Sequence, residues 1–424
     1  MSPSMKDQLE LPCGLVLPNR LVKVKHLEGE AAPYLRQQLI ASMAEGLAEK
    51  LHIPGARISR VYDKWAWGGW GALLTGNVQI DPRHLGGRGD FATGDFSEAK
   101  PDELDAWKRY ANSCQQHGTP AIAQICHPGR QSPRGAGDRG LFESPIAPSA
   151  IPLDIGKGWA ASIIRNIAFG EPQAMTHADI NRVIAQFVNC ARLLAHCGFS
   201  GIEIHAAHGY LLYQYGGSAE RRARIILDII NQIRKAVPKT FCVGIKLNSA
   251  DHDSEGFEDT MTQISLVVDA GVDFLEVSGG SYEDPTMMGR GLQDEAANAK
   301  SSKSDHREAF FLDFATQARK RFPKQILMLT GGFRTRRGIE AAFQAGVCDL
   351  VGIGRPAVLN PDFPRLMIDD LIYSDHQAQV IFSKVQVPLL ARLLKIRILG
   401  GGAETQYFRD QIQRIAVGIA PRSP

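Results

Sequence analysis

The feature that most constrains the fold is a repeated alternation of short apolar runs with longer segments of helical spacing. Seven such runs occupy residues 71–80, 120–126, 201–207, 241–248, 272–279, 325–331 and 349–354, and an eighth, 19–24, precedes them. Strands that are apolar almost throughout, each followed by a helix, are typical of a parallel sheet covered on both faces. Eight such units predict an α/β fold, a (βα)8 TIM barrel. A doubly wound open sheet is the alternative.

The segments between the strands repeat apolar residues at intervals of three and four. They cover residues 180–196, 225–237, 260–270, 310–322 and 338–345. Residues with side chains suited to helix capping precede or open several of them. The predicted N-caps are Asp179, Ser218, Asp259 and Thr335.

Polar residues follow several of the predicted strands at their carboxyl ends. They are Asn77, Gln124, His127, His205, His208, Lys246, Ser278 and Arg355. A barrel gathers its active site at this end of its strands. The glycine fingerprint of dinucleotide-binding open sheets and the P-loop pattern are both absent from the sequence. The pattern therefore favours the barrel over the open sheet.

Charge and cysteine usage exclude some classes of function. The 424 residues carry a net charge of only +3, which gives no indication of a nucleic-acid surface. Seven scattered cysteines without CxxC spacing fit a reduced, cytoplasmic setting. No apolar run reaches the roughly 18 residues of a membrane helix, and residues 387–402 are interpreted as a helix that packs on the domain rather than on a membrane. A small-molecule substrate is expected, and the oligomeric state is left open, a homo-oligomer included.

Two regions lie outside the βα repeat. Residues 128–176 form a long stretch rich in Gly, Pro and Ser, and connections of that length are usually functional, as a lid or a substrate wall. The tail beyond the last unit is a separate extension. The predicted organisation is one barrel domain, 11–370, followed by a C-terminal extension, 371–424.

Two glycine turns close the predicted strands seven and eight, in LTGGFRTRR and VGIGRPAV. In a barrel, the loops after these strands commonly bind phosphate. Gly331, Gly332 and Gly354 allow backbone N–H groups to approach an anion, and Arg334 or Arg355 adds positive charge. The alternative is a pair of ordinary turns.

The segment HAAHGY places His205, His208 and Tyr210 directly after a core strand. A metal site is disfavoured because no carboxylate follows at ligand spacing; a structural pair of histidines is a second interpretation. The third is a donor pair that binds an anionic oxygen, with Tyr210 as proton donor. A phenol is a weak acid, which suits protonation of a carbanion-like centre. Lys246 needs an anionic partner if it points inward, and Gln124 offers both a donor and an acceptor.

These stretches together resemble the Old Yellow Enzyme family of FMN-dependent ene-reductases and NADH:flavin oxidoreductases, in a fungal-type form. The matching segments include LPCGLVLPNRLVK, ASMAEGLAE, AIAQICHPGR, GIEIHAAHGYLL, VGIKLN, LTGGFRTRRGIEAA and VGIGRPAVLNPDF, in family order. The resemblance implies a barrel that holds FMN, is reduced by NAD(P)H, and reduces an activated C=C bond. A larger dienoyl-CoA reductase type, with an iron–sulfur cysteine cluster, is disfavoured by the scattered cysteines.

The resemblance also implies roles for individual residues. Met43 and Ala44 would lie beside the flavin after the first strand, and Gly76 would follow the second. Gln124 would bind the pyrimidine edge, with Lys246 near the anionic side of the ring. The phosphate would be held by Gly331, Gly332, Gly354 and Arg355. His205 and His208 would anchor the electron-withdrawing oxygen of the substrate, and Tyr210 would donate the proton. No metal is implied.

Three departures from the family pattern fall at the expected barrel mouth. An insertion at 24–40 precedes Met43, and Ala44 stands where many relatives carry Thr, Ser or Cys. About a dozen family residues are missing between Gln214 and Tyr215. The alternative function is therefore a catalytically impaired barrel, or one that does not bind flavin. The insertion and the missing loop would also suit a misplaced intron boundary in a gene model, and a transcript lacking the insertion would support that explanation.

Overall fold

The computed structural model describes most of the chain. It covers residues 3–24, 48–50, 52–87, 89–140, 142–155, 159–249, 254–278, 314–381 and 397–422. The predicted flavin neighbours Met43 and Ala44, and most of the insertion at 24–40, lie outside the described residues.

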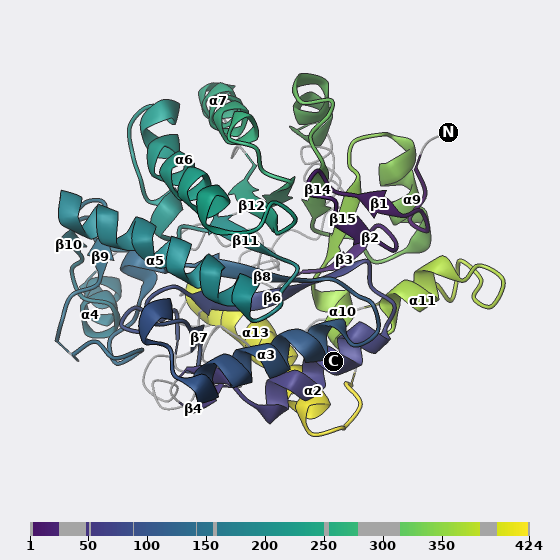
Figure 1. Cartoon of the computed structure of the whole chain (residues 1–424), viewed down its shortest axis with the longest axis horizontal. Coiled ribbons are helices and arrows are strands. Elements are labelled where there is room, and N and C mark those ends of the chain that lie inside the picture. Colours follow the sequence, from purple (N-terminus) through teal and green to yellow (C-terminus); the bar gives the residue numbers. More distant parts are fainter. Residues whose placement is uncertain are drawn as a thin grey trace.

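Eight parallel strands form a closed barrel (Figure 1). They are β3 (Leu21–Lys23), β6 (Ala72–Gln79), β8 (Ala121–Cys126), β11 (Gly201–Ala206), β12 (Cys242–Asn248), β13 (Phe274–Ser278), β14 (Leu327–Thr330) and β15 (Leu350–Ile353). β3 pairs with β15 on one side and with β6 on the other, which closes the ring. The short strand β7 (Phe91–Ala92) pairs in parallel with the end of β6. The prediction of a βα barrel is confirmed, and the open sheet is wrong.

Helices cover the outside of the barrel. They include α2 (Ala56–Trp67), α3 (Pro101–Gln115), α5 (His177–His196), α6 (Ala219–Ala236), α7 (Ser254–Asp269), α9 (Arg336–Gln344), α10 (Arg355–Leu359) and α11 (Phe363–Ile368). Residues 314–321 are also helical. The main hydrophobic core lies between this layer and the strands. All five predicted helical segments are confirmed in the residues that the structure describes, which exclude 310–313, and α6 and α7 begin six residues earlier than predicted.

Two of the four predicted N-caps are confirmed. The side chains of Ser218 and Thr335 accept hydrogen bonds from the first turns of α6 and α9. Asp179 is wrong as a cap, because Thr176 caps α5 and Asp179 bonds back to it from the third helical position. Asp259 is also wrong, since α7 begins earlier and contains it.

The barrel interior is apolar at the amino ends of the strands. Val22, Leu74, Ile122, Phe274 and Met328 belong to one buried cluster there. A hairpin of β1 (Leu9–Glu10) and β2 (Val16–Leu17) contributes further members of this cluster and closes the floor of the barrel. The packing is tight, since a Cβ added to Gly244 of β12 would lie 2.1 Å from the ring of Phe274.

The long connection after β8 has more secondary structure than the sequence indicated. It contains the 3-10 turn η2 (Gly129–Gln131), strands β9 (Ile146–Ala147) and β10 (Gln173–Ala174), and α4 (Trp159–Ala168). β9 and β10 pair in parallel. Leu153, Ile155, Ala168 and Phe169 form a small hydrophobic cluster of their own. The region is therefore a packed flank of the barrel in the part that the structure describes.

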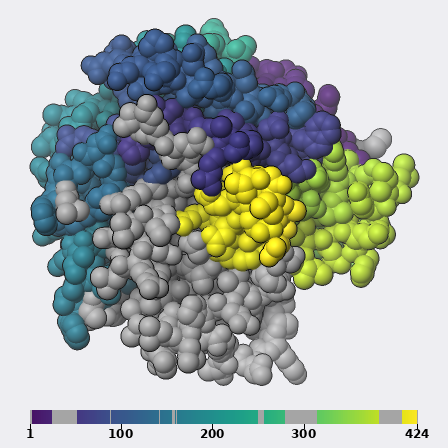
Figure 2. Space-filling view, turned by 90° about the horizontal axis from the view of Figure 1, so that it is seen from below, coloured from purple at the N-terminus to yellow at the C-terminus, as the bar shows by residue number. Residues whose placement is uncertain are grey.

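Smaller elements complete the chain. They are β4 (Ala48–Lys50), β5 (Ile53–Pro54), η1 (Phe96–Glu98), η3 (Leu211–Tyr213) and α13 (Arg397–Ala416). Helix α13 lies against α2, and the C-terminal residues form a yellow patch on one face of the molecule (Figure 2). Arg60 Nε of α2 donates to the carbonyl of Ala416 at 2.8 Å. Residues 387–396 of the predicted packing helix lie outside the described residues. No helix in the described ranges has the length and apolarity to cross a membrane.

Candidate active site

The barrel interior turns polar toward the carboxyl ends of its strands. Because side chains alternate along a strand, Cys242, Lys246 and Asn248 of β12 share the inward face. The register places Lys246 between His205 of β11 and Glu276 of β13. Neighbouring strands show the same order, with apolar side chains at the amino end and polar side chains at the carboxyl end, which we call the rim. The predicted gathering of polar residues at the carboxyl end is confirmed for those that the structure describes.

A buried ion pair lies below the rim. Lys246 Nζ is 2.5 Å from Glu276 Oε1, and both side chains are almost completely shielded from solvent. Beside them, Gln124 Nε2 donates to Glu203 Oε2 at 2.5 Å. Burial, and then the negative charge of Glu276, raise the pKa of Glu203 well above its usual range. The raised pKa favours the protonated form of Glu203 beside the Lys246–Glu276 ion pair.

Glu276 is a residue of this site that sequence reasoning missed. An anionic flavin was expected to be the partner of Lys246, whereas Glu276 already fills that role. The signal was available in FLEVS, since a single acid in an otherwise apolar strand needs a buried partner. What the sequence lacked was the register that sets this strand beside GIKLN.

His205 and His208 are bonded to each other. The Ala207 N–H donates to His205 Nδ1 at 3.3 Å, so the proton of a neutral His205 ring lies on Nε2. His205 Nε2 is 3.1 Å from His208 Nδ1, and His208 Nε2 is 3.1 Å from Ser278 Oγ. We assign protons on both Nε2 atoms from this network. The chain of donors ends at Ser278, so the two rings do not converge on one external atom in this conformation.

Tyr210 lies under the same rim, with only 3% of its surface exposed. Its hydroxyl oxygen accepts a hydrogen bond from Asn77 Nδ2 at 3.0 Å. The ring packs edge-on to His205, with centroids 4.7 Å apart. Three of the predicted residues, Tyr210, His205 and His208, are thus in one contact group, and Asn77 joins it from β6.

The two glycine turns lie next to each other. Thr330 of β14 pairs with Gly352 of β15, and the turns follow directly. Gly331 and Gly332 have φ angles of 144° and 74°, which favour glycine. A Cβ at Gly331 would have nothing within 4 Å, so the backbone there faces open space. Gly354 and Arg355 begin α10 at the end of β15.

Gly76 has a different environment from the one predicted. It lies within β6 rather than after it. Its N–H donates to the hydroxyl of Tyr62 at 2.8 Å, and Tyr62 belongs to α2 in the outer layer. The backbone donor of Gly76 is therefore occupied by the helix layer.

A second polar cluster lies beyond β6 and β8, and its members Asp81 and His84 were not singled out from the sequence. His84 Nδ1 is 2.8 Å from Asp81 Oδ2, and His127 Nε2 lies 3.9 Å from the same oxygen. All three residues are buried. Burial lowers the pKa of His127 to about 3. Burial alone would raise the pKa of Asp81, but the hydrogen bond from His84 and the two neighbouring rings lower it below its usual value.

The three side chains could reach one metal ion, but their hydrogen bonds oppose it. The Gly129 N–H donates to His127 Nδ1 at 3.0 Å, which leaves the proton of the neutral ring on Nε2. The nitrogen that faces Asp81 is therefore a donor and not a lone pair. His205 and His208 belong to no cluster with metal-ligand geometry among the described residues.

The direct junction between Gln214 and Tyr215 is accommodated in the structure. Gln214 Nε2 donates to the carbonyls of Gly209 at 2.8 Å and of Pro128 at 3.2 Å. Its Oε1 accepts from the Arg130 N–H at 3.2 Å. One side chain thus ties the loop after β11 to the loop after β8.

The chemistry of the rim fits a flavin mononucleotide. Gln124 Oε1, Asn77 Oδ1 and Thr330 Oγ1 are buried acceptors without a hydrogen-bond partner. Buried acceptors of this kind usually have a donor, and the pyrimidine N–H of a flavin is one. The open backbone at Gly331 and the nearby Arg355 match a phosphate. Lys246 fits the flavin less simply, because Glu276 already balances the positive charge that was expected to face the ring.

The model of the NADH:flavin oxidoreductase / NADH oxidase family matches residues 48–371 of this chain. Two fungal relatives match over nearly their whole length. The NADH-dependent flavin oxidoreductase iliE of Hypocrea jecorina is 42% identical, over 92% of this chain and 95% of its own. The NADH-dependent flavin oxidoreductase iccE of Talaromyces variabilis is 39% identical, over 97% of this chain and 98% of its own.

Solved structures share the fold at low identity. The Old Yellow Enzyme homologue of Zymomonas mobilis superimposes with a TM-score of 0.64 at 21% identity, over 89% of this chain and 97% of that one. Morphinone reductase gives a TM-score of 0.63 at 20% identity, over 88% and 91%. At such identity the similarity establishes the barrel architecture.

Proposed function

Because the chain belongs to the NADH:flavin oxidoreductase / NADH oxidase family, that of Old Yellow Enzyme, we propose that it reduces an activated C=C bond of a small molecule. FMN is the cofactor of the family, and NAD(P)H is the reductant. The observation that carries the proposal is the contact group of Tyr210, His205 and Asn77 at the carboxyl rim, beside the unpartnered Gln124 Oε1. When bound, FMN supplies hydride transfer from NAD(P)H to the β-carbon of the alkene.

The binding roles follow from the donors and acceptors of the rim. Gln124 Oε1 would accept from the pyrimidine N–H of the flavin, and Lys246, paired with Glu276, would contribute near the anionic side of the ring. Gly331, Gly332 and Gly354 present backbone N–H groups to the phosphate, and Arg355 adds charge. Met43 and Ala44 belong beside the flavin by family resemblance alone.

Substrate activation falls to the histidines. A donor aimed at the electron-withdrawing oxygen stabilises the charge that develops there in the transition state. His208 Nε2–H is the donor in this chain, and it must turn from Ser278 to the substrate. His205 keeps His208 in the required tautomer through its own Nε2–H.

Tyr210 supplies the proton. Its hydroxyl protonates the α-carbon of the alkene, which leaves a phenolate under the rim. The Asn77 Nδ2–H bond to the phenolic oxygen strengthens as negative charge forms, so it favours proton release. A buried phenolate without such a donor would be costly.

NADH is the reductant we propose, since both fungal relatives are named as NADH-dependent. The alternative remains a barrel that binds no flavin or is catalytically impaired. The observation that favours this alternative is that Lys246 is already paired with Glu276, and His205 already hydrogen-bonds His208, without a ligand.

The first test is the visible absorption spectrum of the purified protein, with and without added FMN. We expect a bound-flavin spectrum that anaerobic NADH bleaches and that a cyclic enone restores. Absence of bound flavin after incubation with FMN would establish the alternative. Bleaching by NADH without reoxidation by any of a panel of enones, maleimides and nitroalkenes would leave a flavin oxidoreductase but exclude alkene reduction.

A further inference from the structure

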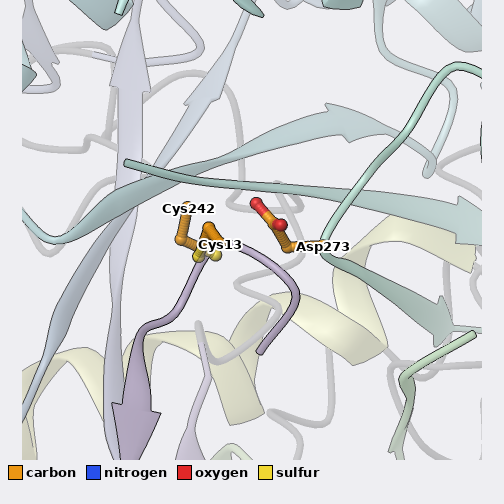
Figure 3. Close-up of side chains that lie close together, drawn as sticks. All are labelled: Cys13, Cys242 and Asp273. Atoms are coloured by element: carbon orange, nitrogen blue, oxygen red, sulfur yellow. The ribbon is translucent and has the colours of Figure 1, made fainter. Parts of the chain in front are cut away.

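Two cysteines meet at the floor of the barrel. Cys13 lies in the β1–β2 hairpin, and Cys242 is the first residue of β12. Their sulfur atoms and a carboxylate oxygen of Asp273 all lie within 4.8 Å of one another (Figure 3). The sulfur atoms point toward each other from segments far apart in the chain. This pair is at the opposite end of the barrel from the proposed flavin site.

A metal ion does not suit this group. Asp273 Oδ2 accepts from Arg234 Nη2 at 2.8 Å and from the Val243 N–H at 2.7 Å, so its charge is paired and this oxygen is already occupied. Structural zinc takes four ligands, and among the described residues this cluster offers two sulfurs and one carboxylate. The chemistry left to the group is that of a dithiol.

The two thiols differ in reactivity. Cys13 is partly exposed, whereas Cys242 is fully buried. The hydrogen bond with Cys242 lowers the pKa of the Cys13 thiol, which favours its thiolate. Burial, and then the bond to Cys13, raise the pKa of Cys242 well above its usual value. Thiolates are the nucleophiles of cysteine chemistry, so Cys13 reacts first and Cys242 stays a thiol beside it.

We propose that Cys13 and Cys242 form a peroxide-sensitive dithiol that closes an intramolecular disulfide between the N-terminal hairpin and β12. The Cys13 thiolate attacks hydrogen peroxide, and with one proton it gives a sulfenic acid and water. The Cys242 thiol then displaces the sulfenic hydroxyl, which forms the disulfide and a second water. The two electrons lost by the sulfurs reduce the peroxide, and a dithiol reductant reverses the bond.

The disulfide would join the β1–β2 hairpin to β12, two segments that already pack together at the amino end of the barrel. The hairpin shares a hydrophobic cluster with Phe274 and Met328 inside the barrel. β12 carries Lys246 at its other end, four residues from Cys242. Oxidation therefore fixes the strand that holds the buried ion pair, and it restrains opening of the floor.

The test is peptide mapping by mass spectrometry after treatment of the reduced protein with hydrogen peroxide, a catalase quench and alkylation in denaturant. We expect the alkylatable thiols to fall from seven to five and a Cys13–Cys242 peptide pair to appear, reversible by dithiothreitol. The thermal unfolding midpoint of the whole protein should rise on oxidation.

The variants separate this bond from general oxidation. Cys13→Ser, in the partly exposed hairpin, should abolish the linked peptide while Cys242 stays alkylatable. Cys190→Ala, at a buried cysteine in α5, should leave the linkage intact. A Cys13 that advances to sulfinic acid with Cys242 still free would overturn the proposal. So would cross-linking between two chains on a non-reducing gel, or no loss of thiols at all.

Discussion

The Tyr210 hydroxyl oxygen accepts a hydrogen bond from Asn77 Nδ2 under the polar rim, and this arrangement predicts the effect of one substitution. Tyr210→Phe removes the proton donor but keeps the ring that packs on His205. We expect FMN binding and anaerobic reduction by NADH to be unchanged. Reoxidation by an enone should slow by about 100-fold or more, the usual contribution of a positioned acid. Stopped-flow measurement of the two half-reactions checks this.

A matched control is Tyr213→Phe, at a tyrosine of η3 with 42% of its surface exposed. It should change neither half-reaction. Equal slowing in both variants would mean that Tyr210 is not the donor.

The buried ion pair predicts a coupling between two glutamates. Glu276→Gln removes the partner of Lys246, but it also removes the negative charge that helps to raise the pKa of Glu203, so Glu203 can ionise and replace it. The loss of unfolding free energy should therefore stay below the roughly 3–5 kcal/mol that an unpaired buried charge costs. The double variant Glu203→Gln/Glu276→Gln should show the full loss. Urea unfolding at neutral pH measures both, and equal losses would show that Glu203 does not take over.

His127 predicts a dependence of stability on pH. Its pKa is lowered to about 3 in the folded protein, against about 6.5 for a free histidine. Between these values the unfolded chain binds a proton that the folded chain does not, so stability falls as pH falls. This residue alone should lower the unfolding free energy by about 3 kcal/mol between pH 8 and pH 4.

His127→Gln should remove this part of the slope in urea unfolding measured across that pH range. His177→Gln, at an exposed histidine of α5, should leave the slope as it is. An unaltered slope in His127→Gln would mean that His127 is not the group responsible.

At the scale of elements, the loop after β11 depends on one side chain. Gln214 makes three hydrogen bonds across two loops at the place where the family segment is missing. Gln214→Ala should cost about 1–3 kcal/mol, because two carbonyls and one N–H lose their partner. It should also expose the junction with Tyr215 to proteolysis. Gln173→Ala, on the exposed β10, is the control; equal cleavage in both variants would contradict the role of Gln214.

The strands and helices were predictable from the sequence because their signals are local. Apolar runs and three-to-four spacing do not depend on distant residues, and Ser218 and Thr335 carry capping chemistry in their own side chains. Asp179 failed because two residues of a capping box look alike in sequence, and the one three positions earlier is the cap. Local patterns thus give the elements, but they place the starts of α6 and α7 six residues too late.

The residues of the site also fall into two groups, those with a local sequence signal and those that depend on contacts between distant segments. Lys246, His205 and Tyr210 were identified because they follow core strands, which is a property of position along the chain. Glu276 as the partner of Lys246, and Ser278 as the partner of His208, depend on which strands are neighbours and in what register. No spacing in a single sequence contains that information. The Cys13–Cys242 contact is hidden for the same reason.

At the scale of the whole molecule, the C-terminal residues complete the surface of the barrel. Val380 N–H donates to the carbonyl of Arg334 at 2.9 Å, and α13 lies on α2. The sequence marked 371–424 as an extension, because it lies beyond the eighth unit. We propose that its described residues support the outer layer, since α13 contacts the helices α2 and α10.

Closure of the ring has a consequence for synthesis of the chain. The pairing of β3 with β15 joins residues 21–23 to residues 351–353, so it cannot form until the last strand has been synthesised. At roughly 5–20 residues per second, a ribosome needs about 15 to 65 seconds to make what lies between. During that interval β3 can pair with β6, but its other edge has no partner and can pair with a neighbouring nascent chain. Chaperone demand should therefore be greatest just before the final strand emerges.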